Sequence, residues 1–189
     1  MPPRLRKAML AVHVASSVGW LGAIVAYIAL NVPVVTGADE DLLRAAHLMM
    51  KPVAWYAVVP LALTSLVTGI VQSLGTPWGL FRHYWVLISL FTTVFATVIL
   101  LLHLGDVDAL AARANDSATD PGSLNGDLFH SVGGLVVLLV PLVLNLYKPR
   151  GLTRYGWRKQ QEQRVAARSS APVPIAREER TGPHGQVTT

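Results

Sequence analysis

The chain has no cysteine among its 189 residues, and charged residues make up only 14% of it. Without cysteine there is no disulfide, no thiolate nucleophile and no thiolate-bound metal. Any metal ion must therefore be bound by histidine, carboxylate, methionine or backbone oxygen. A soluble domain has about 25% charged residues, whereas hydrophobic residues make up 52% of this chain. The composition argues against a soluble fold, and no glycine-rich phosphate loop is present.

Four long apolar runs without any charged residue account for the low charge. They comprise residues 8–30, 52–74, 85–105 and 128–147. At 1.5 Å per residue, each run forms a helix of about 30 Å, the thickness of the hydrocarbon core of a bilayer. Within lipid, a helix satisfies its own backbone hydrogen bonds. The sequence predicts an all-α fold, a transmembrane four-helix bundle over residues 1–150, with the lipid bilayer as its main partner.

Lysine and arginine are distributed unevenly about these spans. Of the 16 basic residues, thirteen lie before the first span, between the second and third, or after the fourth: Arg4, Arg6, Lys7, Arg82, Lys148, Arg150, Arg154, Arg158, Lys159, Arg164, Arg168, Arg177 and Arg180. The other three are Arg44, Lys51 and Arg113, on the side that also carries eight of the 11 acids. By the positive-inside rule, both termini are expected in the cytoplasm and the chain in the plasma membrane. A net charge of +5 arranged in this way indicates no nucleic-acid partner.

The segments outside the spans differ in character. Asp39 is a plausible N-cap for an amphipathic helix over residues 40–51 on the outer surface, which could continue through Pro52 into the second span. The outer segment 106–127 is acidic and rich in small residues, which predicts an exposed and partly flexible loop. Residues 151–189 are expected to form a cytoplasmic tail that is largely disordered. Its basic beginning is expected to lie against anionic lipid headgroups.

The ionisable residues in or at the edges of the spans are all histidines, and they form two layers. His47, His103 and His130 are expected at the outer level, and His13 and His83 at the inner level. Facing imidazoles in a helix bundle can ligate haem b. The sequence therefore predicts an inner site of His13 with His83 and an outer site of His103 with His130, which His47 could join. The same side chains could bind a metal ion or relay protons, and each could have only a structural role at the interface or between helices.

The first span has the arrangement His13-x6-Trp20-x-Gly22, and Trp78-Gly79-Leu80 precedes Tyr84-Trp85 in the inner turn. In these motifs the chain resembles a bacterial family of predicted four-span integral membrane proteins of unassigned function. It is more distantly similar to the copper-resistance D and membrane protoporphyrinogen oxidase families. The resemblance covers residues 8–147 and implies a protein of the bacterial inner membrane. In the protoporphyrinogen oxidase-like family the histidine of the first span is associated with haem, which implies the same role for His13.

Three functions remain open at this point. The first is a haem b protein of electron transfer or haem handling. The second is an accessory or transport subunit for a metal ion or proton, and the third is a structural partner in a membrane complex or homo-oligomer. The spans contain no acid, lysine or arginine, which argues against substrate oxidation by this chain alone.

Overall fold

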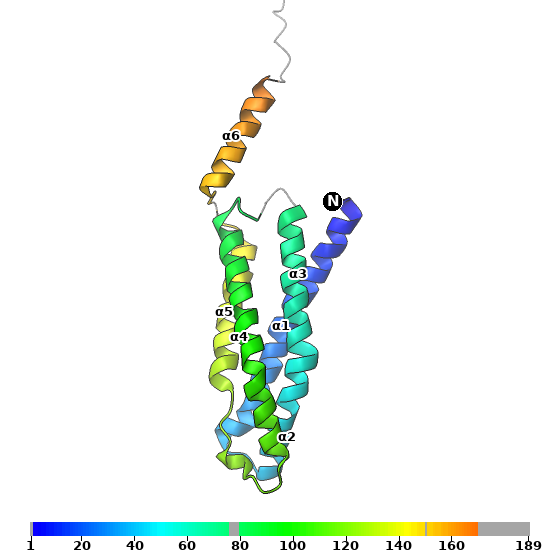
Figure 1. The fold of residues 1–189 in the computed structure, drawn as a ribbon, viewed down its shortest axis with the longest axis vertical. Helices are drawn as coiled ribbons and strands as arrows, with labels where there is room; N and C mark the ends of the chain where they lie inside the picture. The colour runs from blue at the N-terminus through cyan, green and yellow to red at the C-terminus, as the bar shows by residue number, and fades with distance from the viewer. Residues whose placement is uncertain (1, 76–79, 150, 170–189) are drawn as a thin grey trace, which may run out of the picture.

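The computed structural model describes residues 2–75, 80–149 and 151–169. In these residues the protein is helical and has no strand; His83 and Leu152 form an isolated β-bridge. Four helices are apolar and long enough to cross a membrane: Pro3–Thr36, Glu40–Gly75, Tyr84–Asn115 and Leu128–Tyr147. They run side by side along the long axis of the molecule (Figure 1). The predicted all-helical fold with four apolar spans is confirmed for this part of the chain.

The first helix, α1, covers Pro3–Thr36. Proline suits its first turn, where a backbone N–H would have no partner within the helix. It ends at Gly37, which has the left-handed conformation (φ 66°) that terminates many helices. Residues 31–36, which lie beyond the predicted first span (8–30), form the last turns of α1. Their inclusion places Asn31 inside the protein, where its exposed fraction is 0%.

The helix α2 covers Glu40–Val53 and confirms the expected amphipathic helix. The side chain of Asp39 caps it by accepting a hydrogen bond of 3.0 Å from the backbone N–H of Leu42. After Pro52 the chain continues without a break through a π-helical turn, η1 (Ala54–Val58), into α3 (Val59–Gly75). This π-turn lies just before Pro60, which has no N–H to bond the carbonyl four residues earlier in the turn; local π adjustments of this kind accommodate proline in membrane helices.

The helix α4 covers Tyr84–Asn115, so residues 106–115 are helical, and the prediction of a loop there was wrong. A short 3₁₀ turn, η2 (Pro121–Ser123), lies in the segment that follows. The guanidinium group of Arg44 donates hydrogen bonds to the carbonyls of Ala114, Asp116 and Thr119, at 2.5, 2.9 and 3.1 Å. This α2 side chain ties down a segment that the sequence suggested was flexible.

The helix α5 covers Leu128–Tyr147, and α6 covers Arg154–Ser169. The tail was expected to be largely disordered, but its residues 154–169 form α6, and residues 170–189 lie outside the described part. Thr153 joins the start of α6 to the turn before α4, because its backbone N–H donates to the carbonyl of Arg82 at 3.0 Å. Gly156 permits this approach, since a Cβ there would lie 2.3 Å from the same carbonyl oxygen.

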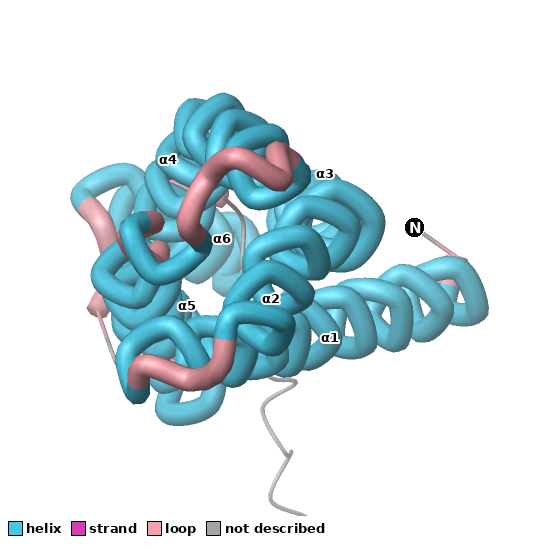
Figure 2. Tube along the Cα trace, turned by 90° about the horizontal axis from the view of Figure 1, so that it is seen from below, coloured by secondary structure: helices cyan, strands magenta, loops and turns pink. Residues whose placement is uncertain are grey.

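The helices contact one another in a ring: α1 packs on α3 and α5, and α4 packs on the same two helices. The helix α2 packs on α1 and α4 (Figure 2). The amino-terminal part of α1 leans away from the other helices in both views (Figures 1 and 2). We refer to the end of the molecule where α1 begins and α6 lies as the α6 end, and to the opposite end as the α2 end.

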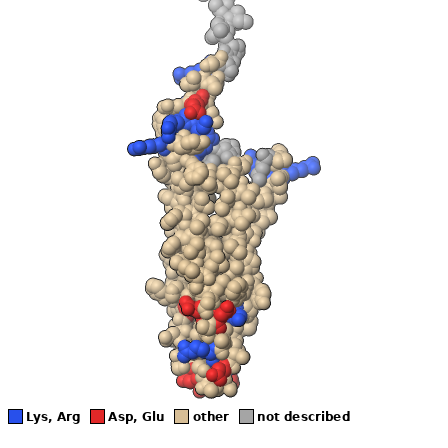
Figure 3. Space-filling view, in the orientation of Figure 1, with Lys and Arg blue, Asp and Glu red and all other residues tan. Residues whose placement is uncertain are grey.

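The distribution of polarity is that of a protein surrounded by lipid. Large apolar side chains of the spans face outward, such as Phe91 and Leu102, with exposed fractions of 73% and 74%. Small polar side chains lie inside, including Ser65, Thr68 and Thr97. Charged side chains gather at the two ends and leave the middle bare (Figure 3). An apolar exterior with polar groups between helices is typical of membrane helices and is consistent with a multi-pass membrane protein.

Candidate functional site

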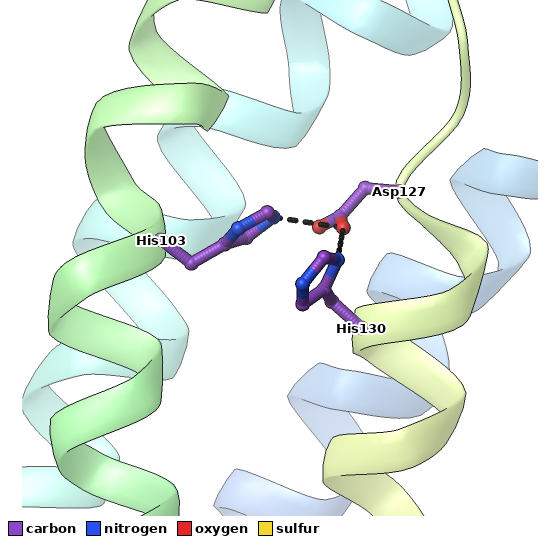
Figure 4. A group of neighbouring side chains, drawn as sticks. All are labelled: His103, Asp127 and His130. Carbon is purple, nitrogen blue, oxygen red and sulfur yellow. Dashed lines mark ion pairs between the residues drawn. The ribbon is translucent and has the colours of Figure 1, made fainter.

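His103, Asp127 and His130 come together near the α2 end, from α4, the residue before α5, and the first turn of α5 (Figure 4). The Asp127 Oδ1 atom lies 2.8 Å from His103 Nε2 and 3.2 Å from His130 Nδ1. The two imidazoles stack with their ring centres 4.2 Å apart and their planes 24° apart. One nitrogen or oxygen atom from each residue lies within 4.8 Å of the other two. The expected approach of His103 and His130 is thus found, with a carboxylate between them.

The backbone before α5 is held in place by α1. The Asn31 Oδ1 atom accepts a hydrogen bond of 2.7 Å from the backbone N–H of Asp127, and its amide donates to the carbonyl of Tyr27 at 3.1 Å. Gly126 allows this contact, because a Cβ at that position would lie 3.0 Å from Asn31 Oδ1. Asp127 and His130 are three residues apart at a helix start, a spacing that places side chains on the same face.

Further polar groups orient the three side chains. The Asp106 carboxylate lies 3.1 Å from His103 Nδ1, the ring nitrogen that faces away from Asp127. The Tyr27 hydroxyl donates to Asp127 Oδ2 at 3.1 Å. A carboxylate beside an imidazole nitrogen orients the ring. Each ring nitrogen of His103 has such a neighbour, Asp106 at Nδ1 and Asp127 at Nε2.

The short distances around Asp127 Oδ1 are not well-formed hydrogen bonds. That oxygen is buried and has no hydrogen-bond partner of good geometry in the described residues, although two ring nitrogens lie within 3.2 Å. A buried carboxylate oxygen without a partner is unfavourable. The cluster therefore has nitrogen and oxygen atoms that could ligate a cation. It lacks hydrogen bonds that would satisfy the buried Asp127 oxygen without one.

An apolar cavity of about 370 Å³ extends from this cluster toward the middle of the spans. Side chains of α1, η1, α4 and α5 line it, and His103, Asp127 and His130 form its polar end. Trp20 and Leu138 lie at its deeper end, in the buried core. On α5, Gly133 and Gly134 border it, and no atom lies within 4 Å of a Cβ built at either glycine.

The remaining three candidate histidines do not join this cluster. His47 is fully buried in α2, where Nδ1 donates to the carbonyl of Leu43 at 2.8 Å and Nε2 has no hydrogen-bond partner of good geometry. His83 lies at the α6 end, directly before α4, with its ring 6.2 Å from that of Trp85. No group of three metal-ligating side chains in the described residues includes either histidine.

His13 lies between α1 and α3. Its Nδ1 is 3.0 Å from the carbonyl oxygen of Ser65 and 3.1 Å from Thr68 Oγ1. The ring packs so closely on Gly69 that a Cβ there would lie 3.0 Å from His13 Cε1. His13 does not line the cavity beside His103. These contacts join two helices, and they give the histidine a packing role.

Four residues of the site were not predicted from the sequence: Asp127, Asp106, Tyr27 and Asn31. Asp127 and Asp106 were counted only among the acids of the outer side, and Asn31 lies just beyond the predicted first span, residues 8–30. The spacing Asp127-x-x-His130 and Asp106 three residues after His103 were signals that could have found the two carboxylates. Tyr27 and Asn31 had no comparable signal. Comparison of the chain with models of protein families, with curated proteins and with solved structures gave no match.

Proposed function

We propose that this multi-pass membrane protein binds a divalent transition-metal ion through His103, Asp127 and His130, between α4 and α5. The observation that carries the proposal is the convergence of two imidazole nitrogens on a buried carboxylate oxygen without a hydrogen-bond partner. A cation placed among them would satisfy all three atoms. Imidazole and carboxylate suit zinc, iron, copper and nickel ions.

The spacing of the donor atoms supports this assignment. Two ligands bonded to zinc at about 2.0–2.1 Å with tetrahedral angles lie about 3.3 Å apart. The separations from Asp127 Oδ1 are 2.8 and 3.2 Å, so only small movements of the side chains would admit the ion. Asp106 behind His103 and the Tyr27 hydroxyl on Asp127 are the outer partners that orient metal ligands in many proteins.

Three protein ligands leave at least one coordination position for water or another molecule. The cavity borders the cluster, so a molecule there could reach that position. The site thus has the composition of a reactive or exchangeable metal centre rather than of a closed structural one. Its place at the α2 end puts it on the periplasmic side if the basic α6 end is cytoplasmic, as the positive-inside rule indicates.

Zinc binding to the purified chain in lipid nanodiscs tests the proposal. We expect one zinc ion per chain in the wild type, and weaker binding in H103A, H130A and D127A. H13Q is the control, because His13 lies outside the cluster and glutamine can keep its hydrogen bond to α3. Equal zinc binding in the three site variants and the wild type would contradict the proposal.

The proposed orientation has a separate test, since the chain contains no cysteine. A single cysteine at Ser123 should react with a membrane-impermeant maleimide added to intact cells whose outer membrane has been permeabilised. A cysteine at Arg164 in α6 should react only after the inner membrane is opened. The reverse labelling pattern would show that the α2 end faces the cytoplasm. It would not bear on whether the chain binds a metal ion.

Haem b is a second candidate, favoured by the open space over Gly133 and Gly134 beside His130. His103 and His130 do not fit as axial ligands on opposite faces of one haem, because their rings stack 4.2 Å apart with no room for a macrocycle. Ligation would have to use one of them alone. A reduced-minus-oxidised spectrum with a Soret band that disappears in H130A would support haem over the metal ion.

A further inference from the structure

We propose that the cavity below the histidine cluster binds the headgroup of a para-quinone dissolved in the bilayer. This inference concerns the cavity that borders the metal site, and it is tested separately from metal binding. It stands on three features: an unpartnered donor deep in the cavity, an opening toward the lipid, and the distance between the polar ends of the cavity.

The deep donor is the indole N–H of Trp20. Trp20 lines the cavity, its exposed fraction is 3%, and its Nε1 atom is buried without a hydrogen-bond partner in the described residues. An indole N–H can only donate, and leaving a buried donor unpaired is unfavourable. The missing partner is an acceptor, and the otherwise apolar lining around it selects an uncharged molecule with a carbonyl oxygen.

The route into the cavity is from the lipid. Three side chains of its wall also contribute to the outer surface of the spans: Phe95 is 49% exposed, Ile99 is 42% exposed and Phe129 is 87% exposed. These residues belong to α4 and α5, so the cavity opens sideways between these helices within the apolar region. A molecule that enters there must already be soluble in the bilayer.

The spacing of Trp20 and Tyr27 along α1 matches a para-quinone. Trp20 and Tyr27 are seven residues apart on α1, which is about 10 Å at 1.5 Å per residue. Tyr27 is bonded to Asp127 and so marks the level of the histidine cluster. The two carbonyl oxygens of a para-quinone are about 5 Å apart, given C=O bonds of about 1.23 Å on a six-membered ring. Two hydrogen bonds of about 2.9 Å extend this to about 11 Å.

The glycines of α5 supply room for a flat ring. Gly133 and Gly134 follow His130 by three and four residues, and both border the cavity with nothing within 4 Å of a Cβ. One carbonyl would accept from Trp20 and the other from His130 Nε2, the ring nitrogen that the metal site does not use, while the isoprenoid tail leaves between α4 and α5. An acyl chain would fill the same space and leave the Trp20 N–H without an acceptor.

Binding of ubiquinone with a single isoprenoid unit to the full chain in nanodiscs tests the inference. We expect saturable binding and a carbonyl stretching band shifted to lower frequency by the indole hydrogen bond. W20F should weaken binding by about tenfold, the effect of one lost hydrogen bond, and remove that shift. W55F is the matched control, because Trp55 donates to Asp108 outside the cavity.

A second pair of variants tests the location. G134L should abolish quinone binding by filling the cavity, whereas G22L adds the same side chain at an exposed site with nothing within 4 Å. Wild-type affinity in either W20F or G134L overturns the inference, as does the absence of saturable quinone binding. Displacement of quinone by haem with a Soret band would assign the cavity to haem and also overturn it.

The same nanodisc samples distinguish quinone binding from metal binding. Quinone binding is measured after treatment with a chelator and again with zinc, and zinc binding is measured in W20F. Loss of quinone binding with wild-type zinc affinity in W20F is the expected result. Quinone binding without any zinc binding in the wild type would contradict the metal proposal and would leave the quinone proposal supported.

Discussion

Replacing Asp106 by asparagine should weaken metal binding although Asp106 itself would not touch the metal. Its side chain is 79% exposed and lies 3.1 Å from His103 Nδ1, on the far side of the ring from Asp127. The carboxylate holds the ring in one orientation and makes Nε2 a better ligand. Loss of such an outer partner lowers metal affinity by about 10–100-fold, or about 1.4–2.7 kcal/mol.

The assay is zinc titration of the purified chain in nanodiscs, with a competing chelator to measure the dissociation constant. D108N is the control, because Asp108 lies on the same helix and carries the same charge but pairs with Lys51 and Trp55. Any general effect of charge at the α2 end therefore appears in both variants. An affinity loss in D106N no larger than that in D108N would refute the role of Asp106 in orienting His103.

Three other substitutions test the packing around the site. H13L should lower the thermal stability in detergent, since it removes a hydrogen bond to the Ser65 carbonyl worth about 0.5–1.5 kcal/mol. Zinc affinity should stay unchanged, and loss of zinc binding would mean that His13 belongs to the site. R44A should raise the rate of amide hydrogen exchange at Asp116 and its neighbours, because three backbone carbonyls lose the guanidinium donor. An unchanged rate would show that contacts other than those of Arg44 hold this segment. G156A should detach the start of α6, because a Cβ would lie 2.3 Å from the carbonyl oxygen of Arg82. Trypsin should then cleave α6 faster than in the wild type, and an unchanged cleavage rate would contradict this contact.

The sequence predicted the spans well because their signal is local. Each apolar run has to be helical in lipid, whatever its neighbours do. The cap at Asp39 and the amphipathic helix after it are also local features, and both are confirmed. The extension of α4 to Asn115 was missed because the acids Asp106 and Asp108 were taken as the start of an outer loop. Residues 109–114 are nevertheless rich in alanine, and Val107, Ala111 and Ala114 are buried at helical spacing, so a local signal was present.

The candidate site was predicted in part for the same reason. His103 and His130 stand out because ionisable residues are rare in apolar spans. The contribution of Asp127 depends on the packing of α5 against α1 through Asn31, residues that lie 96 positions apart. His13 and His83 appeared to share a layer by depth alone. Depth does not determine which face of a helix a side chain occupies, and the His13 ring contacts α3 instead.

Zinc K-edge X-ray absorption of the zinc-loaded chain in nanodiscs tests the central claim most directly. The account predicts two imidazole nitrogens and at least one oxygen at about 2.0–2.2 Å from each zinc ion. H130A should show the loss of one imidazole from this shell. A spectrum with no imidazole scattering, or one that H103A and H130A leave unchanged, would contradict the proposed metal site.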